Sequence, residues 1–475
     1  MRVLSVASEC APLVKTGGLA DVVGALPGAL APEGVEMRVL LPGYPAVLAA
    51  LDGAEAVAEL PALMGGPARI LAATAGGLSV FVLEAAHLYD RPGNIYLGPD
   101  GRDWPDNGER FAALAQAAAR IGAGHAAGDW GPDVLHLHDW QAGLSPVYLE
   151  ARGARLPTVM TIHNIAFPGL LPGAKMGALG LDPADFTPEG FEFWGQVSML
   201  KAGINWADRI TTVSPTYARE LTRPEFGMGF DGVLAGRAGR LTGILNGLDT
   251  GIWNPAEDTH LARPYRQPRG KAASRRALIT EMGLDPGAAG PLAVVVSRLT
   301  GQKGIDLLIE ALPALLSRGG QLAVLGAGDP GLEAALARLA EAEPGVAVRI
   351  GYDEALAHRM IAGGDAMIVP SRFEPCGLTQ LAALRYGTVP VVALTGGLAD
   401  TVITASPAAL SAGVATGLQF HPVTAGSLAW ALADLCALFA APASFAQMQR
   451  NAMRAEVGWR RSAGAYSALY GEIAG

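Results

Sequence analysis

Short apolar runs of strand length alternate with amphipathic segments along this chain, and the alternation starts twice. In the first half, four runs are apolar enough to be buried on both faces of a sheet, at residues 2–7, 134–137, 158–162 and 210–213. Amphipathic segments rich in Ala and Leu, such as residues 109–126, lie between several of them. This alternation predicts βαβ units, which build a doubly wound parallel sheet.

A second series of apolar runs follows, separated by helices predicted at 304–318 and 377–386. Its strands are predicted at residues 293–297, 321–325, 346–350, 366–369 and 390–394. Between the two series, residues 246–270 are rich in Gly, Pro and polar side chains, which indicates a linker region. We therefore expect two Rossmann-like α/β domains facing each other across a deep cleft, over residues 1–245 and 246–455, with a last helix within 456–475.

One string of eight residues occurs in both halves with a single difference. It is TGGLADVV at residues 16–23 and TGGLADTV at residues 395–402. Each copy is predicted to follow a strand and to open a helix. The repetition favours two related halves over an array of short repeats, because no period of solenoid length is present.

Composition excludes several classes of protein. The 475 residues are 50% hydrophobic and 17% charged, which is typical of a large globular enzyme, and the net charge of −9 gives no reason to expect nucleic-acid binding. No apolar segment reaches 18 residues without interruption, so we expect no membrane span. The first residues resemble a strand rather than a secretory signal, so we expect the cytoplasm. The three cysteines have no CxxC spacing, so neither a disulfide framework nor a zinc site is expected.

Two motifs of the first half place polar groups at strand ends. The paired glycines in Lys15-Thr16-Gly17-Gly18 let the backbone approach a ligand closely. The helix that follows points its free N–H groups toward such a ligand, and the lysine suits a phosphate. The same glycines could instead form only a tight turn. Histidines end two predicted strands, in His136-Leu137-His138-Asp139 and in His163-Asn164. Of the first pair, only His138 is expected to reach the cleft.

Two loops of the second half carry the other candidates. Arg298 and Lys303 lie in one loop at the carboxyl end of a strand, where open α/β sheets bind ligands, and two cations suit a diphosphate unless they are solvated surface charges. Glu374 follows the strand predicted at residues 366–369 and could accept hydrogen bonds from a sugar. Cys376 is expected to be a small, partly buried residue that offers its backbone N–H, not a nucleophile. With no DxD, HExxH or cysteine cluster, no metal is expected.

Together these strings resemble the glycogen and starch synthases of glycosyltransferase family five, which have the two-domain GT-B fold. The resemblance extends over nearly the whole chain and includes KTGGLADV, TIHNIAFPG, VSRLTGQKGIDL and RFEPCGLTQ. The KTGG start and the RFEPCGLTQ string are the most specific. It implies a last helix that crosses back to the first domain. It also implies a retaining transfer of glucose from ADP-glucose to the 4-hydroxyl of glycogen or a malto-oligosaccharide, without a separate cofactor.

The resemblance also implies roles for individual residues. Lys15, Arg298, Lys303, His163 and Glu374 would be catalytic. The donor and the sugar would be bound by these five and by Gly17, Gly18, Asp21, Asp139, Asn164, Asn246, Tyr352, Cys376, Gly377, Leu378 and Thr379, with Tyr352 stacking on adenine and Thr379 touching a phosphate.

Two alternatives stay open, and a third is rejected. Another retaining GT-B transferase, such as a sucrose-type or maltose-phosphate synthase, is opposed by the KTGG string, and its donor and acceptor would distinguish it. A catalytically silent glucan-binding protein is opposed by the intact Lys15, Arg298, Lys303 and Glu374, and a turnover assay would separate the two. A nicotinamide dehydrogenase is opposed by the lack of GxGxxG in the first strand-helix unit.

Overall fold

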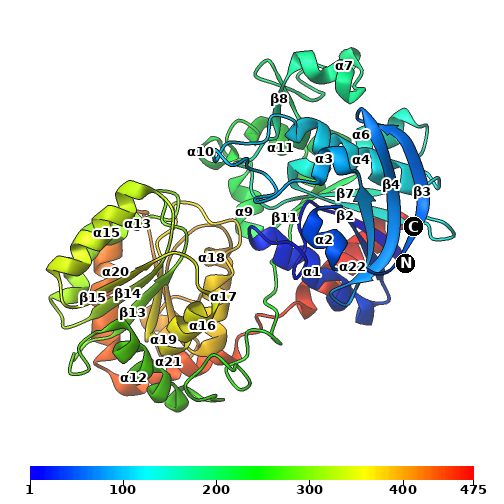
Figure 1. Ribbon diagram of the computed structural model, residues 1–475. Helices are drawn as coiled ribbons and strands as arrows, with labels where there is room; N and C mark the ends of the chain where they lie inside the picture. Colours follow the sequence, from blue (N-terminus) through cyan, green and yellow to red (C-terminus); the bar gives the residue numbers. More distant parts are fainter. The chain divides into compact units, whose positions relative to one another are not determined.

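The computed structural model describes all 475 residues, and the chain divides into two compact units (Figure 1). Unit 1 contains Met1–Asn246 and Trp459–Gly475, and unit 2 contains Gly247–Gly458. The chain therefore passes between the units twice, after Asn246 and after Gly458. The sequence placed these two boundaries after residues 245 and 455.

Unit 1 is built on a sheet of nine strands in the order β12-β11-β7-β6-β1-β2-β5-β4-β3. The strands are β1 (Arg2–Val6), β2 (Glu36–Pro42), β3 (Asp52–Leu63), β4 (Gly66–Ala75), β5 (Leu78–Glu84), β6 (Val134–His138), β7 (Thr158–Ile162), β11 (Arg209–Thr212) and β12 (Leu241–Gly243). The four predicted parallel strands, β1, β6, β7 and β11, are confirmed. The antiparallel pairs β3–β4 and β4–β5 were not predicted. A separate antiparallel sheet contains β8 (Leu170–Pro172), β10 (Gln196–Ser198) and β9 (Glu192–Phe193).

Helices lie on both faces of the main sheet of unit 1 (Figure 1). They are α1 (Gly18–Leu30), α2 (Pro45–Ala49), α3 (Ala86–Tyr89), α4 (Asn107–Gly122), α5 (Asp139–Ala142), α6 (Ser145–Ala151), α7 (Met176–Leu179), α8 (Met199–Trp206), α9 (Pro215–Glu220), α10 (Pro224–Gly227), α11 (Asp231–Gly236) and α22 (Arg460–Ala474). The first and last helices of the chain, α1 and α22, pack together over Val3, Val134 and Val159. The last 17 residues of the chain therefore complete the core of unit 1.

Unit 2 is built on a parallel sheet of six strands in the order β15-β14-β13-β16-β17-β18. The strands are β13 (Leu292–Val296), β14 (Gln321–Gly326), β15 (Val346–Ile350), β16 (Ala366–Val369), β17 (Val389–Ala393) and β18 (Leu418–Phe420). The strand order changes direction at β13 and β16, and open α/β sheets bind ligands beyond the carboxyl ends at such a point. The five predicted strands are confirmed, and β18 is additional.

The helices of unit 2 surround a single large core (Figure 1). They are α12 (Lys271–Met282), α13 (Ile305–Ala311), α14 (Pro313–Leu316), α15 (Pro330–Ala342), α16 (Glu354–Gly363), α17 (Thr379–Tyr386), α18 (Gly396–Thr401), α19 (Pro407–Ser411), α20 (Ala425–Phe439) and α21 (Pro442–Arg454). The prediction that residues 246–270 form a linker is wrong for most of that segment, because Leu248, Leu261 and Tyr265 are buried in this core.

By length and hydropathy no single helix of the chain could cross a bilayer. The pair α20 and α21 meets the criterion only when the two are taken together, and the chain bends by 108° between them.

Candidate active site

The loop after β1 is organised by Glu9, a buried carboxylate that the sequence analysis did not single out. Its side chain accepts hydrogen bonds from Thr16 N at 2.5 Å, from Gly17 N at 3.1 Å and from the Thr16 hydroxyl at 2.9 Å. The Tyr96 hydroxyl donates to the other side of the same carboxylate at 2.9 Å. Glu9 thereby fixes the backbone just before α1 begins.

Lys15, Gly17 and Asp21 lie together at the start of α1. Lys15 Nζ is 2.7 Å from Asp21 Oδ1, and both side chains are more than one-third exposed. Gly17 precedes the helix with an extended backbone, and a Cβ at this position would meet no atom of the protein within 4 Å. Neither local conformation nor crowding in unit 1 explains the glycine. The KTGG string therefore presents an accessible backbone and a cation, as the sequence predicted; Gly18, which is also exposed, is the first residue of α1.

Three buried histidines lie close together, two within β6 and one directly after the neighbouring strand β7. His138 Nδ1 is 2.9 Å from His163 Nε2, and His138 Nε2 is 3.0 Å from the Ser5 hydroxyl. His136 instead contacts the Thr161 hydroxyl at 2.6 Å and the Tyr470 hydroxyl of α22 at 2.7 Å. His138 is fully buried, and its only contact on the outer side is with His163, which is the most exposed of the three at 9%.

Burial controls the protonation of this cluster. Desolvation lowers the pKa of His163 and of His136 to about 3 and also depresses the pKa of His138, so all three imidazoles are neutral at pH 7. A neutral His163 can donate or accept a hydrogen bond to a ligand but brings no positive charge.

Asp139 positions the backbone of His163 from the end of β6. Its Oδ1 accepts a hydrogen bond from His163 N at 2.7 Å and a longer one from Asn164 N at 3.4 Å. Asp139 itself has a φ of 52°, a conformation that non-glycine residues adopt at an energetic cost and that is frequent at functional sites. Burial raises the pKa of Asp139 to about 7, although the two backbone hydrogen bonds oppose this. Asp139 is thus a positioning residue for His163 and Asn164.

Asn246 ends unit 1, and its side-chain oxygen is buried without a hydrogen-bond partner. An orphaned buried acceptor costs about 1–3 kcal/mol, so such an atom is a candidate for a ligand hydroxyl. This observation supports the position that the sequence assigned to the sugar.

In unit 2, the loops after β13 and β16 are held together by close backbone contact. Gly304 has a φ of 67°, and a Cβ there would lie 2.0 Å from the carbonyl oxygen of Pro370. Arg372 N donates to Gln302 O at 2.8 Å, and the Arg372 guanidinium forms a two-pronged ion pair with Asp306 at 2.6 and 2.7 Å. The two candidate loops therefore form one rigid surface at the carboxyl ends of the strands.

Glu374 and Lys303, one from each loop, form an ion pair on this surface. Lys303 Nζ is 2.5 Å from Glu374 Oε2, and the Ser371 hydroxyl donates to the same oxygen at 2.8 Å. The Glu374 side chain is 8% exposed and that of Lys303 is 18% exposed, so the pair is largely removed from solvent. Both residues were predicted from the sequence, but their direct pairing and the contribution of Ser371 were not.

Arg298 and Tyr352 are exposed near the ends of β13 and β15. The exposed Arg298 guanidinium forms no hydrogen bond or ion pair within the protein, so it is available for an anion. Tyr352 is 79% exposed and donates its hydroxyl to Glu354 at 3.1 Å. An aromatic face so open to solvent can stack on a planar ligand.

The segment from Cys376 to Thr379 leads into α17. Cys376 is 3% exposed, which supports its prediction as a buried residue rather than a nucleophile. Gln380 ties this segment down by donating to Cys376 O and Gly377 O, both at 2.9 Å. Leu378 and Thr379 stand at the beginning of the helix, where the first N–H groups have no helical partner. The start of α17 can therefore donate backbone hydrogen bonds to an anion.

The site residues that the sequence analysis did not predict are those that hold the site loops in place through hydrogen bonds. Glu9, Ser371 and Gln380 each bind a loop that carries a predicted site residue. Only Glu9 had a usable signal, because it is an acid that lies between an apolar strand and the KTGG string, six residues before Lys15.

Known proteins resemble this chain over its whole length. Residues 2–236 match the family model of the starch synthase catalytic domain, and residues 290–437 match that of the group 1 glycosyl transferases. A glycogen synthase of Paracoccus denitrificans (strain Pd 1222) is 64% identical, covering 100% of this chain and 99% of its own. One of Jannaschia sp. (strain CCS1) is 60% identical, with 99% and 98% covered.

A solved structure supports the same assignment. The catalytic domain of starch synthase IV from Arabidopsis thaliana, bound to ADP and acarbose, has a TM-score of 0.87 and 29% identity, and covers 100% of this chain and 99% of its own. The expected GT-B fold class is thereby confirmed. The chain belongs to the family of glycogen and starch synthases, glycosyltransferase family five.

Proposed function

We propose that this chain transfers glucose from ADP-glucose to the non-reducing 4-hydroxyl of an α-1,4-glucan, the reaction that lengthens glycogen. The observation that carries the proposal is the pairing of Lys303 with Glu374 beside the unpartnered Arg298. Two cations and one carboxylate on one surface suit a substrate that joins a diphosphate to a sugar. The relatives named glycogen synthase, at 64% and 60% identity, support the same reaction.

The diphosphate is assigned to cations and helix amides of unit 2. Arg298 supplies a guanidinium fork, and Lys303 has two further ammonium donors beside the one that Glu374 accepts. Thr379 and the first N–H groups of α17 add neutral donors. Tyr352 stacks on the adenine. ADP bound to the plant relative is consistent with this assignment.

The glucose is assigned to Glu374, to the backbone from Cys376 to Leu378, and to residues of unit 1. Glu374 accepts sugar hydroxyls and offsets positive charge on the ring. His163, held neutral, Asn164 and Asn246, with its orphaned oxygen, bind hydroxyls, and Asp139 keeps His163 and Asn164 in position. Lys15, Gly17, Gly18 and Asp21 bind the donor's phosphate and glucose through the accessible start of α1.

The proposed chemistry is a front-face displacement that retains the anomeric configuration. The bond from the anomeric carbon to the phosphate oxygen of ADP breaks, and a bond from the same carbon to the acceptor's 4-oxygen forms. The proton of the acceptor hydroxyl passes to the departing phosphate oxygen. Arg298 and Lys303 stabilise the negative charge on ADP, and no metal ion takes part.

The test is nucleotide release with glycogen as acceptor, comparing ADP-glucose with UDP-glucose, each with and without EDTA. We expect rapid ADP release that EDTA does not change, together with lengthened α-1,4-chains in the product. Release from UDP-glucose alone, or no release without a different acceptor, would move the function to a neighbouring transferase. Nucleotide release without chain lengthening would contradict transfer to glucan.

A further inference from the structure

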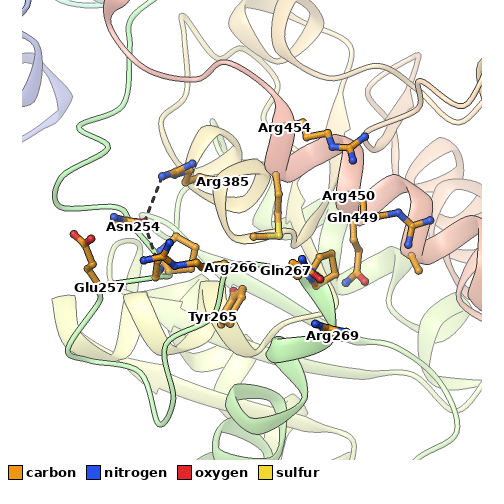
Figure 2. A pocket seen from close by; sticks show the side chains of 15 residues that line it. Asn254, Glu257, Tyr265, Arg266, Gln267, Arg269, Arg385, Gln449, Arg450 and Arg454 are labelled. Carbon is orange, nitrogen blue, oxygen red and sulfur yellow. Dashed lines mark hydrogen bonds between the residues drawn. The ribbon is translucent and has the colours of Figure 1, made fainter.

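Unit 2 contains a large cavity whose walls hold five arginines. The cavity has a volume of about 930 Å³, and Arg266, Arg269, Arg385, Arg450 and Arg454 line it together with a single acid, Glu257. Figure 2 shows these side chains around the opening: Arg385 comes from α17, Arg450 and Arg454 from α21, and Arg266 and Arg269 from the segment before α12. We call this cavity the arginine pocket.

The positive charge of the arginine pocket is not neutralised within the protein. None of its five arginines takes part in an ion pair, although the chain as a whole carries a net charge of −9. Arg450 donates only to the neutral Gln447, at 2.7 Å, and Arg385 only to Asn254, at 3.3 Å. Guanidinium groups stay charged at every accessible pH, so the cluster repels itself until an anion binds.

Arg385 gives an independent sign of a missing partner. Its Nε is buried and has no hydrogen-bond acceptor. Helix C-termini favour cations, which accounts for Arg385 and Arg454 in the last turns of α17 and α21. That argument does not extend to Arg266, Arg269 or Arg450. Arg266 and Arg269 also line an adjoining hollow of about 450 Å³, which continues the basic surface.

The size and floor of the pocket indicate a small organic ligand. The volume lies at the upper end of the usual range for small-molecule sites, about 300–1,000 Å³. Tyr265, Pro255, Ala446 and Met453 give the wall apolar surface between the arginines. A bare inorganic ion would leave most of this space to water, whereas a phosphorylated molecule with a carbon skeleton would fill it.

We propose that the arginine pocket binds a small phosphorylated organic molecule carrying at least two negative charges. The arginine fork matches phosphate oxygens, and arginines on three segments can hold two phosphate groups at once. The ligand's skeleton lies against Tyr265 and Met453. This site shares no residue with the proposed donor site. Helix α17 connects the two sites, because Thr379 is its first residue and Arg385 lies in its last turn. The whole helix is about 12 Å long.

The test is isothermal titration of the full chain, with saturating ADP present throughout to occupy any nucleotide site. The titrants are fructose 1,6-bisphosphate and ATP, with sodium sulfate at matched ionic strength as the control ion. We expect one of the two esters to bind with 1:1 stoichiometry and sulfate to bind far more weakly. The bisphosphate alone would identify a sugar phosphate, and ATP alone would identify a nucleotide.

Variants assign the binding to the pocket. The double substitution Arg450→Gln and Arg454→Gln should weaken binding by about tenfold or more. Glu257→Gln should tighten it, because the only acid of the wall is removed. Arg338→Gln, an exposed arginine of α15 that lies outside the pocket, should leave it unchanged. The proposal is overturned if neither ester binds at millimolar concentration, or if the double variant binds as tightly as the Arg338→Gln control.

Discussion

The string TGGLAD occurs in both units, and its glycines have different surroundings in each. In unit 2, a Cβ on Gly397 would lie 2.2 Å from the carbonyl oxygen of Cys376, and one on Gly396 would lie 1.9 Å from that of Glu374. These glycines let α18 approach the loop that carries Glu374. In unit 1, a Cβ on Gly17 would meet nothing within 4 Å. The glycines of unit 2 are therefore required by close packing, whereas Gly17 of unit 1 lies on an accessible surface.

This contrast predicts opposite consequences for two identical substitutions. Gly17→Ala should change the free energy of unfolding by no more than about 0.5 kcal/mol, because its backbone is extended and unobstructed, while kcat/KM falls at least tenfold. Gly397→Ala should destabilise unit 2 by about 1–3 kcal/mol, because the methyl group overlaps backbone. Thermal unfolding and initial rates of ADP release measure both. Full activity in the Gly17→Ala variant would show that no ligand approaches this backbone.

Asp139 predicts a pH dependence of stability. Its pKa is raised to about 7 in the folded chain and is near 3.9 when unfolded, so between these values the folded state binds more protons. The contribution of Asp139 to stability therefore grows as the pH falls from about 7 toward about 4, and is constant above pH 7. Relative to Asp139→Asn, the wild type should gain on the order of 2 kcal/mol between pH 8 and pH 5. Urea unfolding at both pH values tests this, and equal pH dependence in the two proteins would contradict it.

At the scale of elements, α22 belongs to unit 1 although it ends the chain. Trp459, Tyr466 and Tyr470 are buried against α1 and the sheet. The Tyr470 hydroxyl also reaches the first of the three histidines, 2.7 Å from His136 Nδ1. The C-terminal helix thus contacts the group of three buried histidines to which His163 belongs.

This contact predicts a specific loss of stability. Tyr470→Phe keeps the ring but leaves the buried His136 Nδ1 without a partner, and should destabilise unit 1 by about 1–3 kcal/mol. Calorimetric melting of the full chain measures the change. A variant as stable as the wild type would mean that water replaces the tyrosine hydroxyl at no cost.

The parallel strands could be predicted because they are apolar on both faces, whereas other elements lacked so clear a pattern. The hairpin β3–β4 is rich in alanine, a residue that is depleted in strands, so its sequence gave no clear strand signal. The helix expected over residues 304–318 is two helices, because Pro313 cannot continue the first. In the site, Lys303 and Glu374 followed from motifs at strand ends. Their pairing with Ser371 depends on how the two loops fold, which spacing alone does not specify.

At the scale of the whole molecule, each unit carries its own set of site residues at its own strand ends. Unit 1 offers an accessible glycine backbone beside the Lys15 ammonium, together with neutral histidines and an orphaned asparagine oxygen that suit hydroxyl groups. Unit 2 offers two cations and a carboxylate, which suit a sugar diphosphate. The proposed function therefore depends on both units, and most directly on Lys303 and Glu374.

The most direct measurement is the rate of ADP release from ADP-glucose and glycogen by the wild type, by Glu374→Gln and by Glu281→Gln. Glu281 is the matched control, because it also forms an ion pair in unit 2, with Arg359 of α16. Unlike Glu374, it lies on the exposed surface of α12. We expect kcat to fall by about 10²–10³ in Glu374→Gln and to stay near the wild-type value in Glu281→Gln. Near-wild-type turnover by a folded Glu374→Gln variant would contradict the account.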